Sequence, residues 1–197
     1  MPTPLRFVCV FCGSSEGLRP SYRRVAQEFG ALLARRNVGL VFGGGRVGLM
    51  GAVADAVLAA RGQAIGVIPR TLVEREVGHT GLTKLHIVET MHERKALMAS
   101  LSDAFVALPG GFGTLEEFFE VLTWSQLGLH GKPCGLLNVD GYYDALLALV
   151  EHAVGEKFVP AANRSMVLSD TDPEGLLERL EAYDAPRVPR WISRAQT

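Results

Sequence analysis

Cysteine is scarce in this chain of 197 residues, which has three: Cys9, Cys12 and Cys134. A small, odd number in a chain long enough to bury its own core argues against a secreted disulfide scaffold and indicates reduced thiols. Cys9 and Cys12 form a C-x-x-C, but the apolar run around them predicts a strand, in which an offset of three residues places the side chains on opposite faces. We therefore interpret both as small buried hydrophobic residues rather than as a redox pair or zinc ligands, and we expect no metal site.

Long hydrophobic runs and an excess of either charge are also missing. No apolar stretch reaches the roughly 18 residues of a membrane span, and Phe7–Cys12 is shorter than the ~7–15 residues of a signal-peptide core. Lys and Arg number 20 against 21 Asp and Glu, so the formal net charge is −1. The chain thus lacks the basic excess typical of proteins that bind nucleic acid or anionic membranes without specificity. We expect a cytoplasmic protein with no nucleic-acid or membrane partner.

What the sequence does contain is one alternating pattern of apolar runs and helical periodicity. With 48% hydrophobic residues, it predicts a single α/β domain over residues 1–184 and a C-terminal tail over 185–197. The fold class is Rossmann-like: a doubly wound, mostly parallel sheet with helices on both faces. Strands are predicted at Phe7–Cys12, Gly39–Phe42, Ala64–Ile68, Leu85–Val88, Ala104–Leu108, Cys134–Leu137 and Met166–Leu168. Helices are predicted at Ser21–Arg36, Leu49–Arg61, His92–Leu101, Thr114–Leu127, Tyr142–Gly155 and Pro173–Tyr183.

One segment, Pro69–Thr83, has no clear pattern. Loops of this length in compact domains are often lids or binding loops. The charges that this segment carries are equally compatible with a plain solvated loop, so both interpretations stay open.

Two glycine-rich stretches follow predicted strands, Gly43–Gly51 (GGGRVGLMG) and Pro109–Glu117 (PGGFGTLEE). Glycine lets the backbone turn sharply and approach a ligand, and the free N–H groups at the start of the next helix attract anions. Two such loops at strand ends indicate phosphate binding. The letters G-x-G-x-x-G occur in the first loop, but the next strand ends without the acidic residue that a dinucleotide site requires.

Charged residues cluster beside these loops. Thr114 is a candidate N-cap for a helix with Glu116, Glu117 and Glu120 in its first turns, where carboxylates could simply complement the helix dipole or close a capping box. A carboxylate beside a bound phosphate would instead address another part of the ligand, the sugar. In MHERKALM, Arg94 lies near a helix start and could hold phosphate or ribose oxygens with its fork of donors.

The motifs GGGRVGLMG, IPRTLVERE, MHERKA and PGGFGTLEE, followed by LTWSQLGLHGKPCGLLNVDGYYDALL, resemble the LOG (Lonely Guy) family of cytokinin riboside 5′-monophosphate phosphoribohydrolases. The resemblance runs from the first strand to about Asp170. Family members are often labelled lysine decarboxylase-like, yet no lysine here has recognisable pyridoxal-phosphate partners. Phe112 stands where relatives more often have Tyr.

The resemblance implies hydrolysis of the N-glycosidic bond of an adenine-type nucleoside 5′-monophosphate, without metal or cofactor, by a homodimer whose site lies near the subunit interface. It makes Arg94 and Glu117 the catalytic pair and places the 5′-phosphate at the glycines of PGGFGT. The substrate-binding residues that it implies are Glu76, Lys95, Gly110, Gly111, Phe112, Gly113, Thr114, Leu115, Glu116 and Thr123.

Two other function classes compete with this one. A non-catalytic carrier of a nucleotide or a molybdenum-type cofactor would need only the glycine loops, whereas the joint presence of Arg94 and Glu117 favours an enzyme. A nicotinamide-dependent oxidoreductase is disfavoured because the ribose-binding acid is missing. The sequence does not reveal whether a prenylated adenine or plain AMP is preferred.

Overall fold

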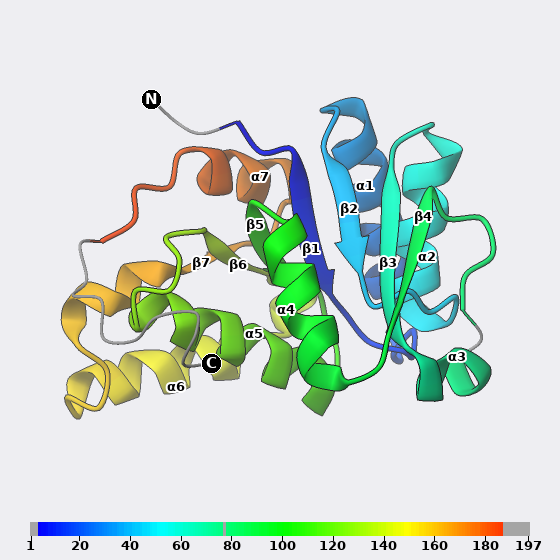
Figure 1. Cartoon of the computed structure of the whole chain (residues 1–197). Coiled ribbons are helices and arrows are strands. Elements are labelled where there is room, and N and C mark those ends of the chain that lie inside the picture. The colour runs from blue at the N-terminus through cyan, green and yellow to red at the C-terminus, as the bar shows by residue number, and fades with distance from the viewer. Residues whose placement is uncertain (1–3, 77, 187–197) are drawn as a thin grey trace.

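The computed structural model describes residues 4–76 and 78–186, with the side chains of residues 74–76 left out. Its centre is a seven-stranded sheet in the order β4-β3-β2-β1-β5-β6-β7, in which all neighbouring strands run parallel (Figure 1). The strands are β1 (Phe7–Phe11), β2 (Gly39–Phe42), β3 (Ala64–Pro69), β4 (Lys84–Val88), β5 (Ala104–Ala107), β6 (Cys134–Leu137) and β7 (Val167–Asp170). The predicted fold class is confirmed.

Helices cover both faces of this sheet (Figure 1). Residues of α1, α2 and α7 pack against one face together with Val8 and Val10, whereas α4, α5 and α6 pack against the other with Cys9 and Phe11. Because side chains alternate along a strand, β1 supplies both layers of the core. The α-helices are α1 (Pro20–Arg35), α2 (Gly48–Ala59), α3 (Arg70–Glu76), α4 (Met91–Leu101), α5 (Phe112–Gln126), α6 (Asp144–Gly155) and α7 (Pro173–Glu181).

The three cysteines are buried and free, as predicted. Cys9 belongs to the core layer under α4 and α5, and Cys12 to the opposite layer. Burial raises the pKa of Cys9 well above its ordinary value and that of Cys134 to about 12, so both thiols stay protonated at neutral pH. Their environment is that of small hydrophobic residues.

The segment Pro69–Thr83 contains a helix that the pattern analysis missed. Helix α3 has seven residues, which is too short for a recognisable apolar period, and its charged composition looks like a loop. After it, Gly78 forms a bridge with Gly45, and the His79 N–H donates to the Gly44 carbonyl at 2.9 Å. The segment is therefore attached to the first glycine loop.

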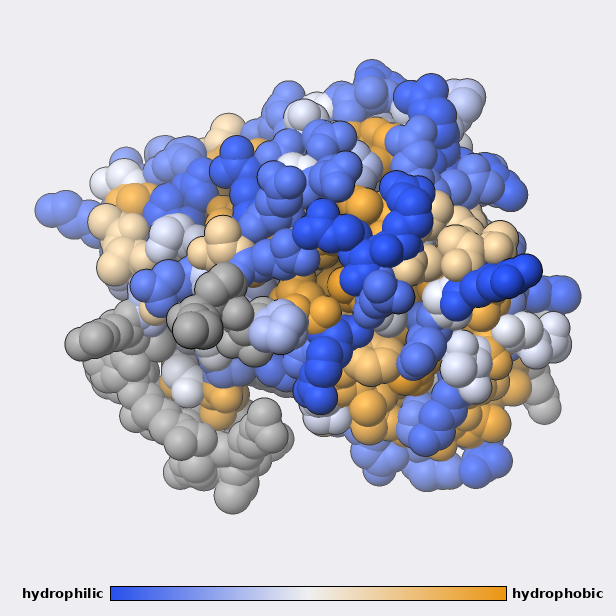
Figure 2. Space-filling model, turned by 90° about the horizontal axis from the view of Figure 1, so that it is seen from above, coloured by the Kyte–Doolittle hydropathy of each residue, from blue (hydrophilic) through white to orange (hydrophobic). Residues whose placement is uncertain are grey.

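The carboxyl ends of the strands lie at the lower edge of the sheet in Figure 1, where α3, α4 and α5 begin. The chain continues from β1 to β2 on one side, while β5 pairs with β1 on the other. This reversal makes the space beyond β1 and β5 the expected ligand crevice. The opposite edge, seen in Figure 2, is covered mainly by hydrophilic side chains. Within the described ranges, no helix is long and apolar enough to cross a membrane.

Candidate active site

A cleft of about 360 Å³ opens at the carboxyl edge of the sheet. It is bounded by residues that follow β1, β3, β4 and β5, together with Met50 of α2, as the topology requires. Its lining consists of Cys12, Gly13, Ser14, Met50, Leu72, Met91, Arg94, Gly111, Phe112, Gly113, Thr114, Glu116 and Glu117. Seven of the twelve site residues singled out in the sequence are thus brought together on one cleft.

The start of α5 forms one wall. Gly111 is the N-cap and Phe112 the first helical residue, so the prediction that Thr114 caps the helix was wrong: Thr114 lies inside the first turn and is buried. The helix starts earlier because Gly111 adopts the extended N-cap conformation. A Cβ at Gly111 or Gly113 would meet no atom within 4 Å. These glycines leave space beside the first N–H groups of α5, which the helix itself does not use.

Arg94 approaches from α4. Thr90 caps this helix by accepting a hydrogen bond from the Glu93 N–H at 3.1 Å, which places Arg94 one turn in. The Arg94 side chain is 8% exposed, and its Nε donates a hydrogen bond of 3.1 Å to the carbonyl of Val67 in β3. A Cβ at Gly43 would stand 2.0 Å from Arg94 Nη2. Gly43 is therefore glycine because the guanidinium occupies the space of a side chain.

Glu117 faces Arg94 across the cleft. The Arg94 Nη1 to Glu117 Oε1 distance is 3.9 Å, and the Glu117 side chain is 13% exposed. This separation is longer than a hydrogen bond, so the two groups form an ion pair across the cleft without a direct hydrogen bond between these two atoms. Burial, and then the negative charge of Glu117, raise the pKa of the Cys12 thiol well above its ordinary value. Cys12 thus contributes a neutral thiol to the cleft lining.

The Lys95 side chain points toward α5, whereas that of its neighbour Arg94 lines the cleft. Its Nζ donates to Glu116 Oε1 at 2.7 Å and to Glu120 Oε1 at 2.9 Å, and it is not among the residues that line the cleft. Burial opposes the charge, but the hydrogen bonds and charges of the two carboxylates raise the pKa of Lys95 above its ordinary value. Lys95 connects α4 to α5, and Glu120 acts as one of its two anchors rather than as a dipole complement.

The remaining predicted residues lie around the rim or away from it. Phe112 is 94% exposed at the edge of the cleft, and Gly110 lines an adjoining hollow. Leu115 packs on the core between β5 and the helices. Thr123 lies exposed farther along α5, where its hydroxyl donates to the Phe119 carbonyl. The side chain of Glu76 lies outside the described part of the structure.

The glycines of the first loop, Gly43–Gly51, pack closely against neighbouring parts of the chain. Gly48, at φ 58°, lies against the backbone of Ser14 and Ser15, and Gly51 lies against the backbone of Arg46. None of the glycines of Gly43–Gly51 lines the cleft. Their small size allows close packing and, at Gly43, admits Arg94.

Six lining residues are not among the predicted site residues: Cys12, Gly13, Ser14, Met50, Leu72 and Met91. Gly13 and Ser14 had a usable signal, because they come shortly after the end of a strand. Leu72 lies on α3 and shows that the segment Pro69–Thr83 takes part in the cleft. In the described ranges, no group of three or more His, Cys, Asp or Glu side chains is arranged to hold a metal ion.

Comparison with known proteins places this site in a family. Residues 50–180 match a family model described as "Possible lysine decarboxylase". A cytokinin riboside 5′-monophosphate phosphoribohydrolase of Rhodococcoides fascians is 52% identical over 92% of this chain and 91% of its own. One of Arabidopsis thaliana is 50% identical over 90% of this chain and 83% of its own. The chain belongs to the LOG family. Its MHERKA motif supplies Arg94, and its PGGFGT motif supplies the first turn of α5.

Solved structures resemble this LOG-family chain in fold. The molybdenum cofactor binding protein of Rippkaea orientalis superimposes with a TM-score of 0.67 at 23% identity, covering 89% of this chain and 95% of its own. The molybdenum cofactor carrier protein of Chlamydomonas reinhardtii gives 0.65 at 20% identity over 90% and 98%. At these identities the likeness concerns the fold alone.

Proposed function

We propose that this LOG-family chain hydrolyses the N-glycosidic bond of cytokinin riboside 5′-monophosphates and of AMP, releasing the free base and ribose 5-phosphate. One observation carries the proposal. Helices α4 and α5 bring a buried guanidinium, Arg94, within 3.9 Å of a carboxylate, Glu117, in a cleft whose wall is a glycine-rich helix start. A carrier needs the helix start but not this pair.

The first turn of α5 is the proposed phosphate site. Its N–H groups and the helix dipole favour a dianion, and Gly111 and Gly113 leave the space open. Gly110 and Thr114 complete the proposed phosphate site. Gly110 packs directly against the Thr114 side chain. Glu117 is one turn further along α5, and this spacing directs its carboxylate to the ribose rather than to the phosphate.

Glu117 and Arg94 have different roles in the proposed reaction. Cleavage of the bond between C1′ and the base nitrogen builds positive charge on the ribose, which the Glu117 carboxylate stabilises. Water forms the new C1′–O bond and gives up a proton to Glu117, while the departing base takes up a proton from solvent. Arg94 holds the ribose hydroxyls with its free N–H donors and keeps the sugar in a reactive pose.

The direct test is product release. Purified protein is incubated separately with AMP and with N6-isopentenyladenosine 5′-monophosphate, and free base and ribose 5-phosphate are measured. We expect equimolar formation of both products. If neither nucleotide is cleaved but one raises the melting temperature, the protein is a carrier and the hydrolase proposal is wrong.

A homodimer in the cytoplasm completes the proposal. Helix α6 contains no buried residue among those described, and it exposes Leu149 by 58%. Phe119 of α5 is 38% exposed and Phe158 84%, and apolar side chains of this kind are typical of interfaces. Sedimentation velocity is expected to give twice the 21.3 kDa chain mass. Sedimentation as a single chain at micromolar concentration would contradict the dimer.

A further inference from the structure

Three successive carbonyl groups of the β5–α5 loop are each held by a donor outside that loop. The Leu108 carbonyl accepts from the Tyr143 hydroxyl at 2.6 Å. The Pro109 carbonyl accepts from the Gly13 N–H at 3.0 Å, and the Gly110 carbonyl accepts from the Tyr142 hydroxyl at 2.6 Å. Ordering a glycine-rich loop costs conformational entropy, and these three hydrogen bonds help to hold the loop in one conformation.

The two tyrosines come from one short turn after β6. The Asn138 side chain accepts from the Tyr143 N–H at 2.7 Å and donates to Asp144 at 2.7 Å. Ser21 of α1 donates to the carboxylate of Asp140, which adopts a left-handed φ of 51°. Both ends of the turn are thus anchored, and the turn directs two consecutive side chains toward the β5–α5 loop.

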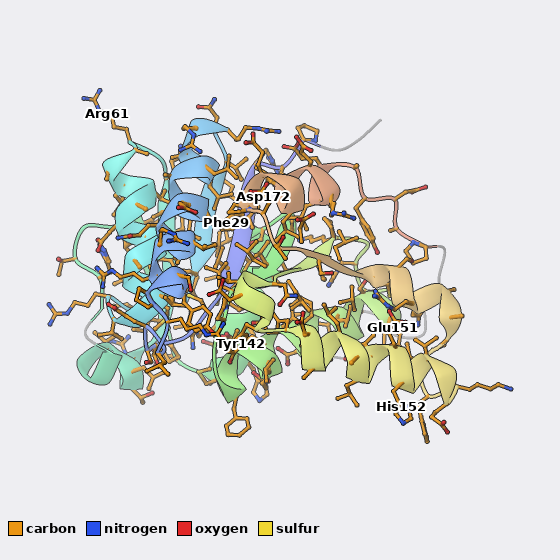
Figure 3. The ribbon with its side chains drawn as sticks, turned by 180° about the vertical axis from the view of Figure 1, so that it is seen from behind. Phe29, Arg61, Tyr142, Glu151, His152 and Asp172 are labelled. Carbon is orange, nitrogen blue, oxygen red and sulfur yellow. The ribbon has the colours of Figure 1, made fainter. Side chains whose placement is uncertain are left out.

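The positions of the two rings differ. Tyr143 is 1% exposed and belongs to the core, whereas Tyr142 is 41% exposed. Figure 3 shows Tyr142 beside the turn that leads into α6. The Tyr22 ring meets the Tyr142 ring edge-on at 5.6 Å and holds it in place. Tyr142 lines the hollow that adjoins the cleft and shares Gly111 with it.

A hydrogen bond to the Gly110 carbonyl also constrains the N–H group of the next residue, Gly111. The carbonyl of Gly110 and the N–H of Gly111 belong to one planar trans peptide unit, so they point in opposite directions. When the Tyr142 hydroxyl fixes the carbonyl, it also fixes the Gly111 N–H, which points away from Tyr142. Gly111 lies at the cleft, where a Cβ would meet no atom within 4 Å. The Thr114 side chain packs against Gly110, whereas the Tyr142 hydroxyl is hydrogen-bonded to the peptide group itself.

We propose that Tyr142 is a positioning residue for the phosphate-binding loop: its hydroxyl holds the Gly110 carbonyl and so orients the Gly111 N–H toward the 5′-phosphate. This inference rests on the proposed function, because it takes the α5 start as the phosphate site. Tyr143, which is buried in the core, stabilises the same loop through its hydrogen bond to the Leu108 carbonyl. Tyr142 is half-exposed. Loss of its hydrogen bond to Gly110 should therefore have little effect on folding, because water can replace the lost partner.

The test is Tyr142→Phe, which keeps the ring and removes the hydroxyl. We expect the KM for AMP to rise about three- to tenfold, the size of one neutral hydrogen bond, with kcat changed less than about twofold. The inhibition constant of ribose 5-phosphate should rise by the same factor, and that of adenine should not change. Tyr22→Phe is the matched control, because no hydrogen bond of the Tyr22 hydroxyl is found in the described ranges.

Two results would overturn the proposal. One is an unchanged inhibition constant for ribose 5-phosphate in Tyr142→Phe. The other is an equal weakening of ribose 5-phosphate and adenine with a lowered melting temperature, which indicates a general structural role. If the wild type releases no base, the hydrolase proposal fails, but the role of Tyr142 can still be tested by calorimetry. Tyr142→Phe should then weaken the binding of AMP and leave the binding of adenosine unchanged.

Discussion

Glu117→Gln is expected to lower kcat for AMP by about 10³-fold, because the amide neither carries the charge that stabilises the ribose cation nor accepts a proton from water. Glutamine has almost the same size and keeps an oxygen that accepts hydrogen bonds, and the 3.9 Å between Arg94 Nη1 and Glu117 Oε1 is longer than a hydrogen bond. The free energy of unfolding should therefore change by no more than about 2 kcal/mol. Steady-state kinetics and urea unfolding measure the two effects on the same preparation.

The matched control is Glu178→Gln, which removes the same charge from an exposed position on α7, far from the cleft. Its kcat should equal that of the wild type. A loss below tenfold in Glu117→Gln would show that another group carries the chemistry. A loss of folding comparable with the loss of activity would show that Glu117 is structural.

Gly43→Ala is expected to lower kcat/KM by about 10²-fold, although Gly43 itself does not line the cleft. The new methyl group would stand 2.0 Å from Arg94 Nη2 and 3.2 Å from its Cζ. The backbone and the core around it are rigid, whereas the guanidinium is the end of a flexible side chain, so Arg94 must move. A displaced guanidinium no longer holds the sugar opposite Glu117.

Two further variants isolate this effect. Gly155→Ala adds a methyl group where nothing lies within 4 Å, and it should leave activity unchanged. Because Gly43→Ala acts through Arg94, the double variant Gly43→Ala/Arg94→Ala should be no less active than Arg94→Ala alone. Additive losses would mean that Gly43 has a role of its own, such as a direct contact with the ligand.

Much of the fold could be predicted because its signals are local. Buried parallel strands appear as short continuous apolar runs, and all seven runs became strands of one sheet. The Cys9 and Cys12 side chains lie on opposite faces for the same reason, since alternation along a strand depends on spacing alone. Helix α3 had no such signal, because seven charged and apolar residues are too few to show a period.

The candidate site was predicted where a strand end or a family motif marked it. The topology places the residues after β1, β4 and β5 at the same edge of the sheet. Three strands separate β4 from β5, so Arg94 meets Glu117 because α4 packs back across β3, β2 and β1. The destination of the Lys95 side chain could not be predicted, because its partners Glu116 and Glu120 lie on another helix. The same holds for Leu72 and Met50, whose place in the cleft depends on how α2 and α3 pack.

By itself, then, the sequence determined the alternation of strands and helices, the two glycine-rich strand ends and the identities of Arg94 and Glu117, because each depends on neighbours along the chain. Only the tertiary structure decided that Gly43 is glycine for the sake of Arg94, that Lys95 is paired with carboxylates, and that Tyr142 reaches the Gly110 carbonyl. These contacts join residues that are distant in sequence. They form only when the packed sheet brings the separate loops to one edge.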